Sequence, residues 1–191
     1  MNKQEALQVV QEILPEHRFE HTKRVVETAK QLAGRNDADI DKVTYAAIWH
    51  DIAKYFDEDY MYEIIYTHPE IPNELLNYHV SLWHAPVGSV YVRETYNLLD
   101  QDVLNGMTYH TTGRAGMSTL EKIVFLADYI EPGRAFPGID EVRHLAETDL
   151  DAAVCQSLAN TIQFLVAKNA QVHPDTVDAY NELIKNKEEH E

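Results

Sequence analysis

Apolar residues recur every three or four positions along almost the whole chain, and the alternation of apolar and polar residues that is typical of a half-buried β-strand is missing. Only seven Gly and seven Pro interrupt the 191 residues. Such a chain buries its apolar stripes by packing helix against helix, so the sequence predicts an all-α helical bundle. We expect helices near residues 3–13, 17–34, 39–54, 58–67, 73–82, 85–97, 100–110, 118–131, 139–148, 150–170 and 174–188.

Residues that start and end helices lie between these segments. Pro69, Pro72 and the segment EPGRAFPG separate helical stretches. Ser118 followed by Glu121 predicts a capping box, and Pro174 suits the first turn of a helix. No repeat or linker divides the chain, and its length suits a single domain.

The charge balance excludes some partners. Asp and Glu number 32 against 16 Lys and Arg, which gives a net charge of −16. No basic cluster compensates for it, so we expect no nucleic-acid partner. The start MNKQEALQVV is polar and no apolar run approaches the roughly 18 residues of a membrane span, which predicts a cytoplasmic protein without a membrane partner. The lone Cys155 cannot form an internal disulfide, as suits a reducing cytosol.

Three helical segments carry His or Asp residues on faces that should turn toward the core. His50 continues an apolar stripe near the end of AAIWHDIAK, and Asp51 follows it directly. His21 precedes Val25 by one turn on the apolar face of its own segment, and Asp128 lies on the apolar face of LEKIVFLADYI. Each of these segments is therefore expected to present polar side chains to the protein interior.

A shared metal ion would stabilise a buried set of this kind, because an unpaired buried carboxylate is costly. Each residue also has an ordinary alternative: a lone buried His is commonly hydrogen-bonded, Asp51 can pair with Lys54, and Asp128 can pair with an Arg. We favour the metal because the sequence offers no obvious cations to match these inward groups. The predicted ligands are His21, His50, Asp51 and Asp128.

Two further His residues stand at predicted helix junctions, where they can point into a cleft. His84 lies in WHAP just before Pro86, and His110 lies in MTYHTTGR at the end of a helix. A capping or surface role is the alternative for both. We expect surface or structural roles for His17, His68, His79, His144, His173 and His190.

The order H…HD…D of the inward residues resembles the HD superfamily of metal-dependent phosphohydrolases. Within it, HRFEHTKRVVETA, HDIAK, HAPVG and YHTTGRAGMSTLEKIVFLADYIEPGRAFPGIDEVR are similar to the bacterial YqeK-type symmetrical bis(5'-nucleosyl)-tetraphosphatases. The match covers residues 18–150 and the flanks are similar helices, so the resemblance implies that residues 1–191 form one HD domain. It also implies symmetrical hydrolysis of diadenosine tetraphosphate into two ADP, with iron or a similar divalent metal bound.

The resemblance implies the same metal ligands by motif position, and it adds residues that contact the substrate. His84, His110 and Lys54 are expected to act in catalysis, the two His at the phosphates and Lys54 by orienting Asp51. Imidazole and carboxylate ligands suit Fe, Mn, Co or Ni, and a second ion or basic side chains must supply the remaining positive charge. The implied substrate contacts are Arg18, His21, Trp83, His84, Ala85, Pro86, His110, Asp128, Gly133 and Arg134.

Other interpretations of these residues stay open. The nearest alternative keeps the fold and the metal but takes a guanosine tetraphosphate alarmone or a 5'-nucleotide as substrate. The sequence also leaves open whether the enzyme prefers adenine or guanine, and therefore whether the product is ADP or GDP. A non-catalytic helical binding module is disfavoured, because such a module has no need of buried carboxylates. The oligomeric state is open too, with a homodimer as one alternative. A di-iron oxygenase would use His21, His50, Asp51, His84, His110 and Asp128 as ligands.

Overall fold

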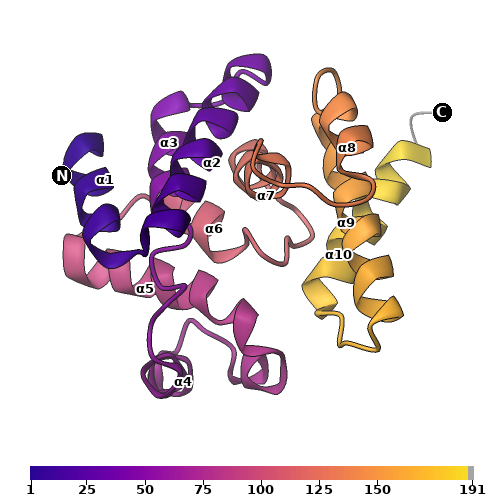
Figure 1. The fold of residues 1–191 in the computed structure, drawn as a ribbon. Helices are drawn as coiled ribbons and strands as arrows, with labels where there is room; N and C mark the ends of the chain where they lie inside the picture. Colours follow the sequence, from indigo (N-terminus) through magenta and orange to yellow (C-terminus); the bar gives the residue numbers. More distant parts are fainter. Residues whose placement is uncertain (189–191) are drawn as a thin grey trace.

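The computed structural model describes residues 1–188, and within this range the chain forms helices, short 3₁₀ turns and loops but no β-strand (Figure 1). The predicted all-α class is confirmed, while His190 lies outside the described residues. The elements are α1 (Lys3–Ile13), α2 (Glu16–Arg35), α3 (Ile40–Trp49), α4 (Glu58–Thr67), the 3₁₀ turns η1 (Asn73–Asn77) and η2 (Val80–Leu82), α5 (His84–Tyr96), α6 (Gln101–Thr108), α7 (Thr119–Ile130), α8 (Ile139–Leu145), α9 (Leu150–Ala167) and α10 (Pro174–Glu188).

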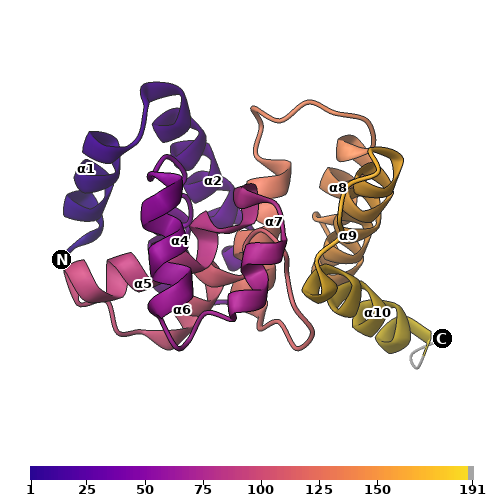
Figure 2. The same ribbon diagram turned by 90° about the horizontal axis from the view of Figure 1, so that it is seen from below.

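Helix α7 occupies the middle of the arrangement. It packs against α2 and α6 on one side and against α9 on the other, while α2 and α6 both contact α3. Helices α8 and α10 both pack on α9, and both views show α7 between α2 and this C-terminal group (Figures 1 and 2). Segments that are distant in sequence therefore meet around α7.

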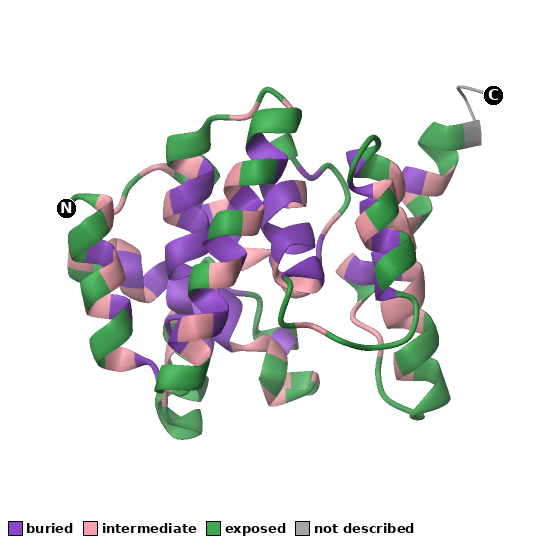
Figure 3. Cartoon of the chain, turned by 45° about the horizontal axis from the view of Figure 1, so that its top comes forward, coloured by how far each residue is buried: buried purple, intermediate pink, exposed green. Residues whose placement is uncertain are grey.

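The apolar core lies in these central helices, where Figure 3 shows most of the buried residues. Ile123, Val124 and Leu126 of α7 are completely buried, and Leu32 of α2 is 2% exposed. A helix buried on most of its sides holds its polar residues away from water as well. Among residues 1–188 we find no helix with the length and apolar character needed to cross a bilayer.

The predicted helix starts are confirmed where capping residues were recognised. The Ser118 side chain accepts a hydrogen bond from the Glu121 backbone and the Glu121 carboxylate accepts one from the Ser118 backbone, which completes the capping box of α7. Pro174 is the first residue of α10. Helix α7, which carries Asp128, therefore starts at a fixed position.

The predicted helix 39–54 is too long, because α3 ends at Trp49. The backbone then turns with hydrogen bonds between residues three apart, from Ile52 N to Trp49 O (3.0 Å) and from Lys54 N to Asp51 O (2.9 Å). Ile52 is completely buried, so the apolar pattern continues although the α-helix has ended. The pair His50–Asp51 thus sits on a tight turn and not in a helix.

Other predicted boundaries need smaller corrections. The segment 73–82 forms the two 3₁₀ turns η1 and η2 in place of one helix. The predicted ends at 110, 148 and 170 lie two or three residues beyond those of α6, α8 and α9. Helix α9 stops because Asn169 adopts a left-handed conformation with φ of 53°.

Candidate metal centre

His21 lies on the buried face of α2 and is 4% exposed. Its Nδ1 donates a hydrogen bond to Glu131 Oε1 at 3.0 Å. Its Nε2 lies 3.0 Å from Asp128 Oδ1 and 3.7 Å from Asp51 Oδ2. This one imidazole therefore contacts carboxylates from the turn after α3, from α7 and from the residue after α7.

The turn after α3 places His50 and Asp51 beside this ring. His50 Nδ1 donates to the carbonyl of Ala47 at 2.7 Å, which leaves Nε2 facing Asp51 Oδ2 at 3.2 Å. Both residues are completely buried. Burial alone would raise the pKa of Asp51, but the neighbouring imidazoles of His50, His110 and His84 hold that pKa well below its usual range. Asp51 is therefore a buried carboxylate anion.

His84 and His110 complete the ring of imidazoles. His84 is the first residue of α5, and its Nε2 lies 3.0 Å from Asp51 Oδ1 and 3.2 Å from His110 Nε2. His110 follows α6 and donates from Nδ1 to the carbonyl of Met107 at 2.6 Å. Burial lowers the pKa of His110 and lowers that of His84 to about 4, so both rings are neutral at pH 7 before any ion binds.

The six candidate ligands from the sequence converge in one cluster. Their nitrogen and oxygen atoms form three overlapping groups, and within each group the atoms lie within 4.8 Å of one another. The groups are His21, His50 and Asp51; His50, His110 and Asp128; and Asp51, His84 and His110.

The expectation that these carboxylates lack matching cations is wrong. Arg18 pairs with Asp51, and Arg134 Nη2 lies 2.6 Å from Asp128 Oδ1. Burial alone would raise the pKa of Asp128, but His21 and the nearby charges hold it far below its usual range. A pair of Asp128 with an Arg was one alternative from the sequence, but the sequence did not specify Arg134, which lies in a loop. The pair of Arg18 and Asp51 was not predicted, because the two residues come from different elements.

The arginines do not satisfy the cluster completely. Among the described residues, Nε2 of His21, Nε2 of His50 and both carboxylate oxygens of Asp51 are buried without a hydrogen-bond partner of good geometry. Buried polar atoms rarely go unpaired in native proteins. Imidazole and carboxylate donors around such atoms suit a divalent ion of intermediate softness, so the residues fit a divalent metal.

The other predicted substrate-contact and catalytic residues differ in how close they lie to the His and Asp cluster. Lys54 Nζ is 3.4 Å from His84 Nε2, and burial lowers its pKa. Ala85 is completely buried, and the Trp83 indole donates to the carbonyl of Leu75 at 3.2 Å. Pro86 lines a cavity of 410 Å³ that borders neither His110 nor Asp128. The structure therefore brings Lys54 to the cluster, whereas the indole of Trp83 is engaged elsewhere.

Two residues of the site were missed by the sequence analysis. Glu131 is 1% exposed and binds His21 as described, and Arg24 Nε donates to Glu131 Oε2 at 2.5 Å. Burial alone would raise the pKa of Glu131, but Arg24 and His21 hold it below its usual value. The sequence feature that could have indicated them is Glu131, an acid directly after an apolar helical segment, together with Arg24, which lies one helical turn after His21.

A cavity opens next to the cluster. It has a volume of 320 Å³ and is lined by Lys54, His110, Asp128 and Arg134 together with the aromatic ring of Phe136. An adjoining cavity of 700 Å³ lies between η1, η2 and the C-terminal helices. The two cavities share the lining residues Ser81, Leu82, Thr111 and Thr161.

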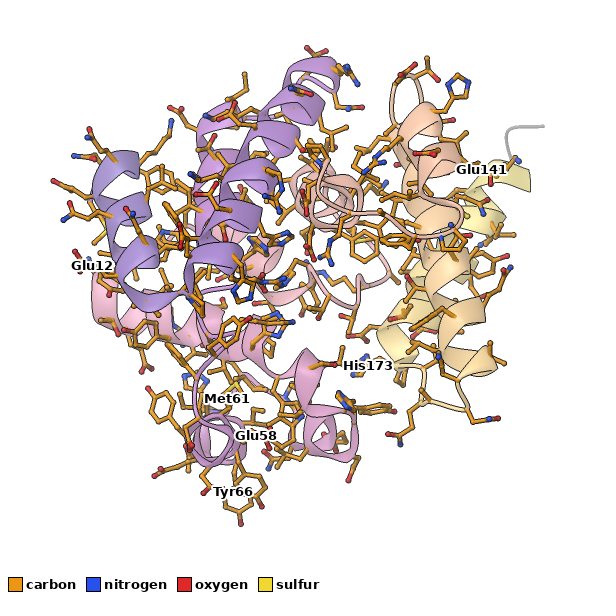
Figure 4. The ribbon with its side chains drawn as sticks, viewed as in Figure 1. Glu12, Glu58, Met61, Tyr66, Glu141 and His173 are labelled. Carbon is orange, nitrogen blue, oxygen red and sulfur yellow. The ribbon has the colours of Figure 1, made fainter. Side chains whose placement is uncertain are left out.

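The adjoining cavity reaches the start of α10. His173, which Figure 4 labels, lines it. The ring of His173 lies beside that of Tyr78, with ring centroids 4.6 Å apart. The space next to the candidate metal centre therefore continues into a second cavity.

Comparison with known proteins agrees with this geometry. Residues 18–133 match the HD domain family. The chain is 50% identical to "Bis(5'-nucleosyl)-tetraphosphatase, symmetrical" of Bacillus subtilis, over 96% of this chain and 98% of that relative. The protein of the same name from Staphylococcus aureus is 40% identical over 95% of this chain and 94% of its own length.

A solved structure agrees as well. The crystal structure of a predicted HD superfamily hydrolase involved in NAD metabolism from Clostridium acetobutylicum superposes with a TM-score of 0.92 at 37% identity, and the match covers 97% of this chain and 98% of that one. The resemblance inferred from the sequence motifs is thus confirmed. The chain belongs to the HD domain family and, within it, to the family of symmetrical bis(5'-nucleosyl)-tetraphosphatases.

Proposed function

We propose that this chain is a metal-dependent hydrolase that cleaves diadenosine tetraphosphate symmetrically into two ADP. The observation that carries the proposal is the buried His and Asp cluster at one end of a continuous pair of cavities. The names of the Bacillus subtilis and Staphylococcus aureus relatives support the choice of reaction.

His21, His50, Asp51 and Asp128 would hold the metal ion, for which we propose iron. They offer two imidazoles and two carboxylates, a mixture that suits Fe, Mn, Co or Ni better than Ca. When bound, such an ion supplies Lewis acidity toward phosphate and lowers the pKa of water. Nδ1 of His50 is engaged with the carbonyl of Ala47, so its Nε2 is the nitrogen that is free to bind a cation.

Arg18 and Arg134 would bind the phosphates. In the structure they neutralise Asp51 and Asp128, and their side chains are 16% and 33% exposed. With a divalent ion neutralising these carboxylates, the two guanidinium groups become available to phosphate oxygens, to which they can donate paired hydrogen bonds. This arrangement explains how a chain with a net charge of −16 can bind a polyphosphate.

Lys54, His84 and His110 would complete the phosphate site. Lys54 lines the 320 Å³ cavity beside His110 and brings a positive charge to it. His84, with a pKa lowered to about 4, is a neutral hydrogen-bonding group at pH 7. We therefore assign the charge at the phosphates to Lys54 and the arginines, and we assign hydrogen bonding to the two His.

The cavities would receive the two nucleoside halves of the substrate. Phe136 packs edge-on against Tyr129 with ring centroids 5.0 Å apart, at the wall of the smaller cavity. In the larger cavity the paired rings of Tyr78 and His173 offer another aromatic surface. Aromatic rings at both places suit a ligand that carries a base at each end.

The test is a hydrolysis assay with purified chain and added Fe²⁺ or Mn²⁺. Diadenosine tetraphosphate should yield ADP as the sole nucleotide product on chromatography, and Asp51→Asn should abolish the reaction. Diguanosine tetraphosphate, guanosine tetraphosphate and a 5'-nucleotide are assayed in parallel. Release of ATP with AMP, or turnover of the alarmone or the 5'-nucleotide alone, would refute the proposal.

A further inference from the structure

The carboxylate of Glu131 is held in place by three donors. It accepts hydrogen bonds from His21 Nδ1 at 3.0 Å, from Arg24 Nε at 2.5 Å and from the backbone of Gly133 at 2.6 Å. Glu131 is 1% exposed and follows the last residue of α7, three positions after Asp128. A buried carboxylate with three donors has little freedom to move, so it can fix whatever it binds.

This contact keeps a proton on one particular nitrogen of His21. An ionised carboxylate can only accept, so Nδ1 donates to Glu131, which leaves Nε2 as the nitrogen that can bind a metal ion. Nε2 is the atom that faces Asp128 and Asp51. His50 and His110 reach the same state by donating from Nδ1 to backbone carbonyls, so among these three His residues His21 alone depends on a side chain.

The surroundings of Glu131 are shaped to keep Arg24 in position. Arg24 comes from α2, one turn after His21, and a Cβ at Gly133 would lie 2.6 Å from its Nε. Gly133 therefore leaves room for the guanidinium. Arg143 donates to the backbone carbonyls of Glu131 (3.0 Å) and Arg134 (2.9 Å), which fixes the loop that carries them.

We infer that Glu131, oriented by Arg24, is a positioning residue that sets the tautomer and the orientation of His21 for metal binding. The inference rests on the proposed function, because it takes His21 as a metal ligand. Carboxylates that hold the second nitrogen of a ligating His raise its basicity and remove wrong orientations. Loss of such a contact commonly weakens metal affinity by about 10- to 100-fold.

Glu131→Gln tests the inference against a matched control, Glu121→Gln. Glu121 is also a buried carboxylate, 2% exposed in α7, and it pairs with Arg114 at 2.7 Å away from the cluster. Calorimetric titration of each metal-free chain with Mn²⁺ gives the affinity without substrate. We expect Glu131→Gln to bind about 10- to 100-fold more weakly than the wild type, and Glu121→Gln to match the wild type.

The tautomer is measured separately by ¹⁵N NMR of His-labelled, metal-free chain. His21 should carry a proton on Nδ1 in the wild type, and the fraction of chains with a proton on Nδ1 should fall in Glu131→Gln. If Glu131→Gln does not fold, Arg24→Gln takes its place and should also weaken Mn²⁺ binding.

Each outcome separates this inference from the proposed function. Equal Mn²⁺ affinity in the wild type and Glu131→Gln, or equal losses in Glu131→Gln and Glu121→Gln, would overturn the positioning role and leave the hydrolase untouched. A wild type that binds Mn²⁺ but does not cleave diadenosine tetraphosphate would refute the proposed substrate alone. A wild type that binds no Mn²⁺ would overturn both.

Discussion

Replacing Asp51 by Asn tests the proposed metal centre directly. The Asp51 carboxylate is completely buried, 3.2 Å from His50 Nε2 and 3.0 Å from His84 Nε2. The amide keeps the size of the side chain but removes its negative charge, which is what a divalent cation requires at the centre of the cluster. We therefore expect Asp51→Asn to fold and to lose most of its affinity for the ion.

The expected effect can be stated as a shift in melting temperature. An ion at 100 times its Kd stabilises the folded wild type by about 2.7 kcal/mol. At about 2–4 °C per kcal/mol for a chain of this size, its Tm should rise by about 5–11 °C. If Asp51→Asn binds the ion 100-fold more weakly, the same ion concentration equals its Kd. The ion then stabilises the variant by only about 0.4 kcal/mol, and its Tm should rise by about 1 °C.

Differential scanning calorimetry with and without Mn²⁺ measures both shifts. The control is Asp100→Asn, which removes a carboxylate 3.0 Å from Lys42 on the surface. Asn also caps helices well, so the start of α6 is preserved. If Asp51→Asn gains as much melting temperature from Mn²⁺ as the wild type and the control, the cluster is not the site that binds the ion.

Three further predictions concern the arginine, the helix cap and the carboxylates. Arg18→Gln should lower kcat/KM for diadenosine tetraphosphate by about 10- to 150-fold in steady-state kinetics, because a hydrogen bond to a charged group contributes about 1.5–3 kcal/mol. Ser118→Ala should lower the free energy of unfolding by about 1 kcal/mol in urea, with no change in products, because it removes the cap of α7. In metal-free chain the pKa of Asp51 and that of Glu131 lie below their usual values, so the unfolded chain binds more protons in acid. The free energy of unfolding should therefore stay constant above about pH 4.5 and fall as the pH drops through the pKa values of these groups in the folded chain. Urea unfolding from pH 7 to pH 3 measures this, and the free energy of unfolding should decline less in Glu131→Gln than in the wild type.

The sequence was a good guide to the helices and a poorer one to their ends. The sequence located α1 and α4 to the residue, because a proline, Pro15 or Pro69, stands two positions after each helix end. After α3 the stripe continues through the buried Ile52, although the backbone has changed to turns. Burial and helical hydrogen bonding are separate properties, and hydrophobic periodicity reports only burial.

For the site, the sequence supplied the candidate ligands but not the residues that pair with them. His21, His50 and Asp128 could be recognised because each continues an apolar stripe, where a polar residue is conspicuous, and Asp51 because it follows His50 directly. The contact between His21 and Glu131 spans 110 positions, and no local pattern specifies a pair at that separation. Residues that orient a ligand are therefore found only when the helices are assembled.

The arginine pairs also explain how the chain can fold before it meets an ion. Asp51, Asp128 and Glu131 each have at least one guanidinium partner. Asp51 and Glu131 are both buried. Leaving a buried charge without its partner costs about 3–5 kcal/mol, so two such losses would reach about 6–10 kcal/mol. That is comparable with the whole free energy of unfolding of a typical domain, about 5–15 kcal/mol. We therefore expect this chain to fold without metal, in contrast to small zinc domains, in which metal binding supplies the folding free energy.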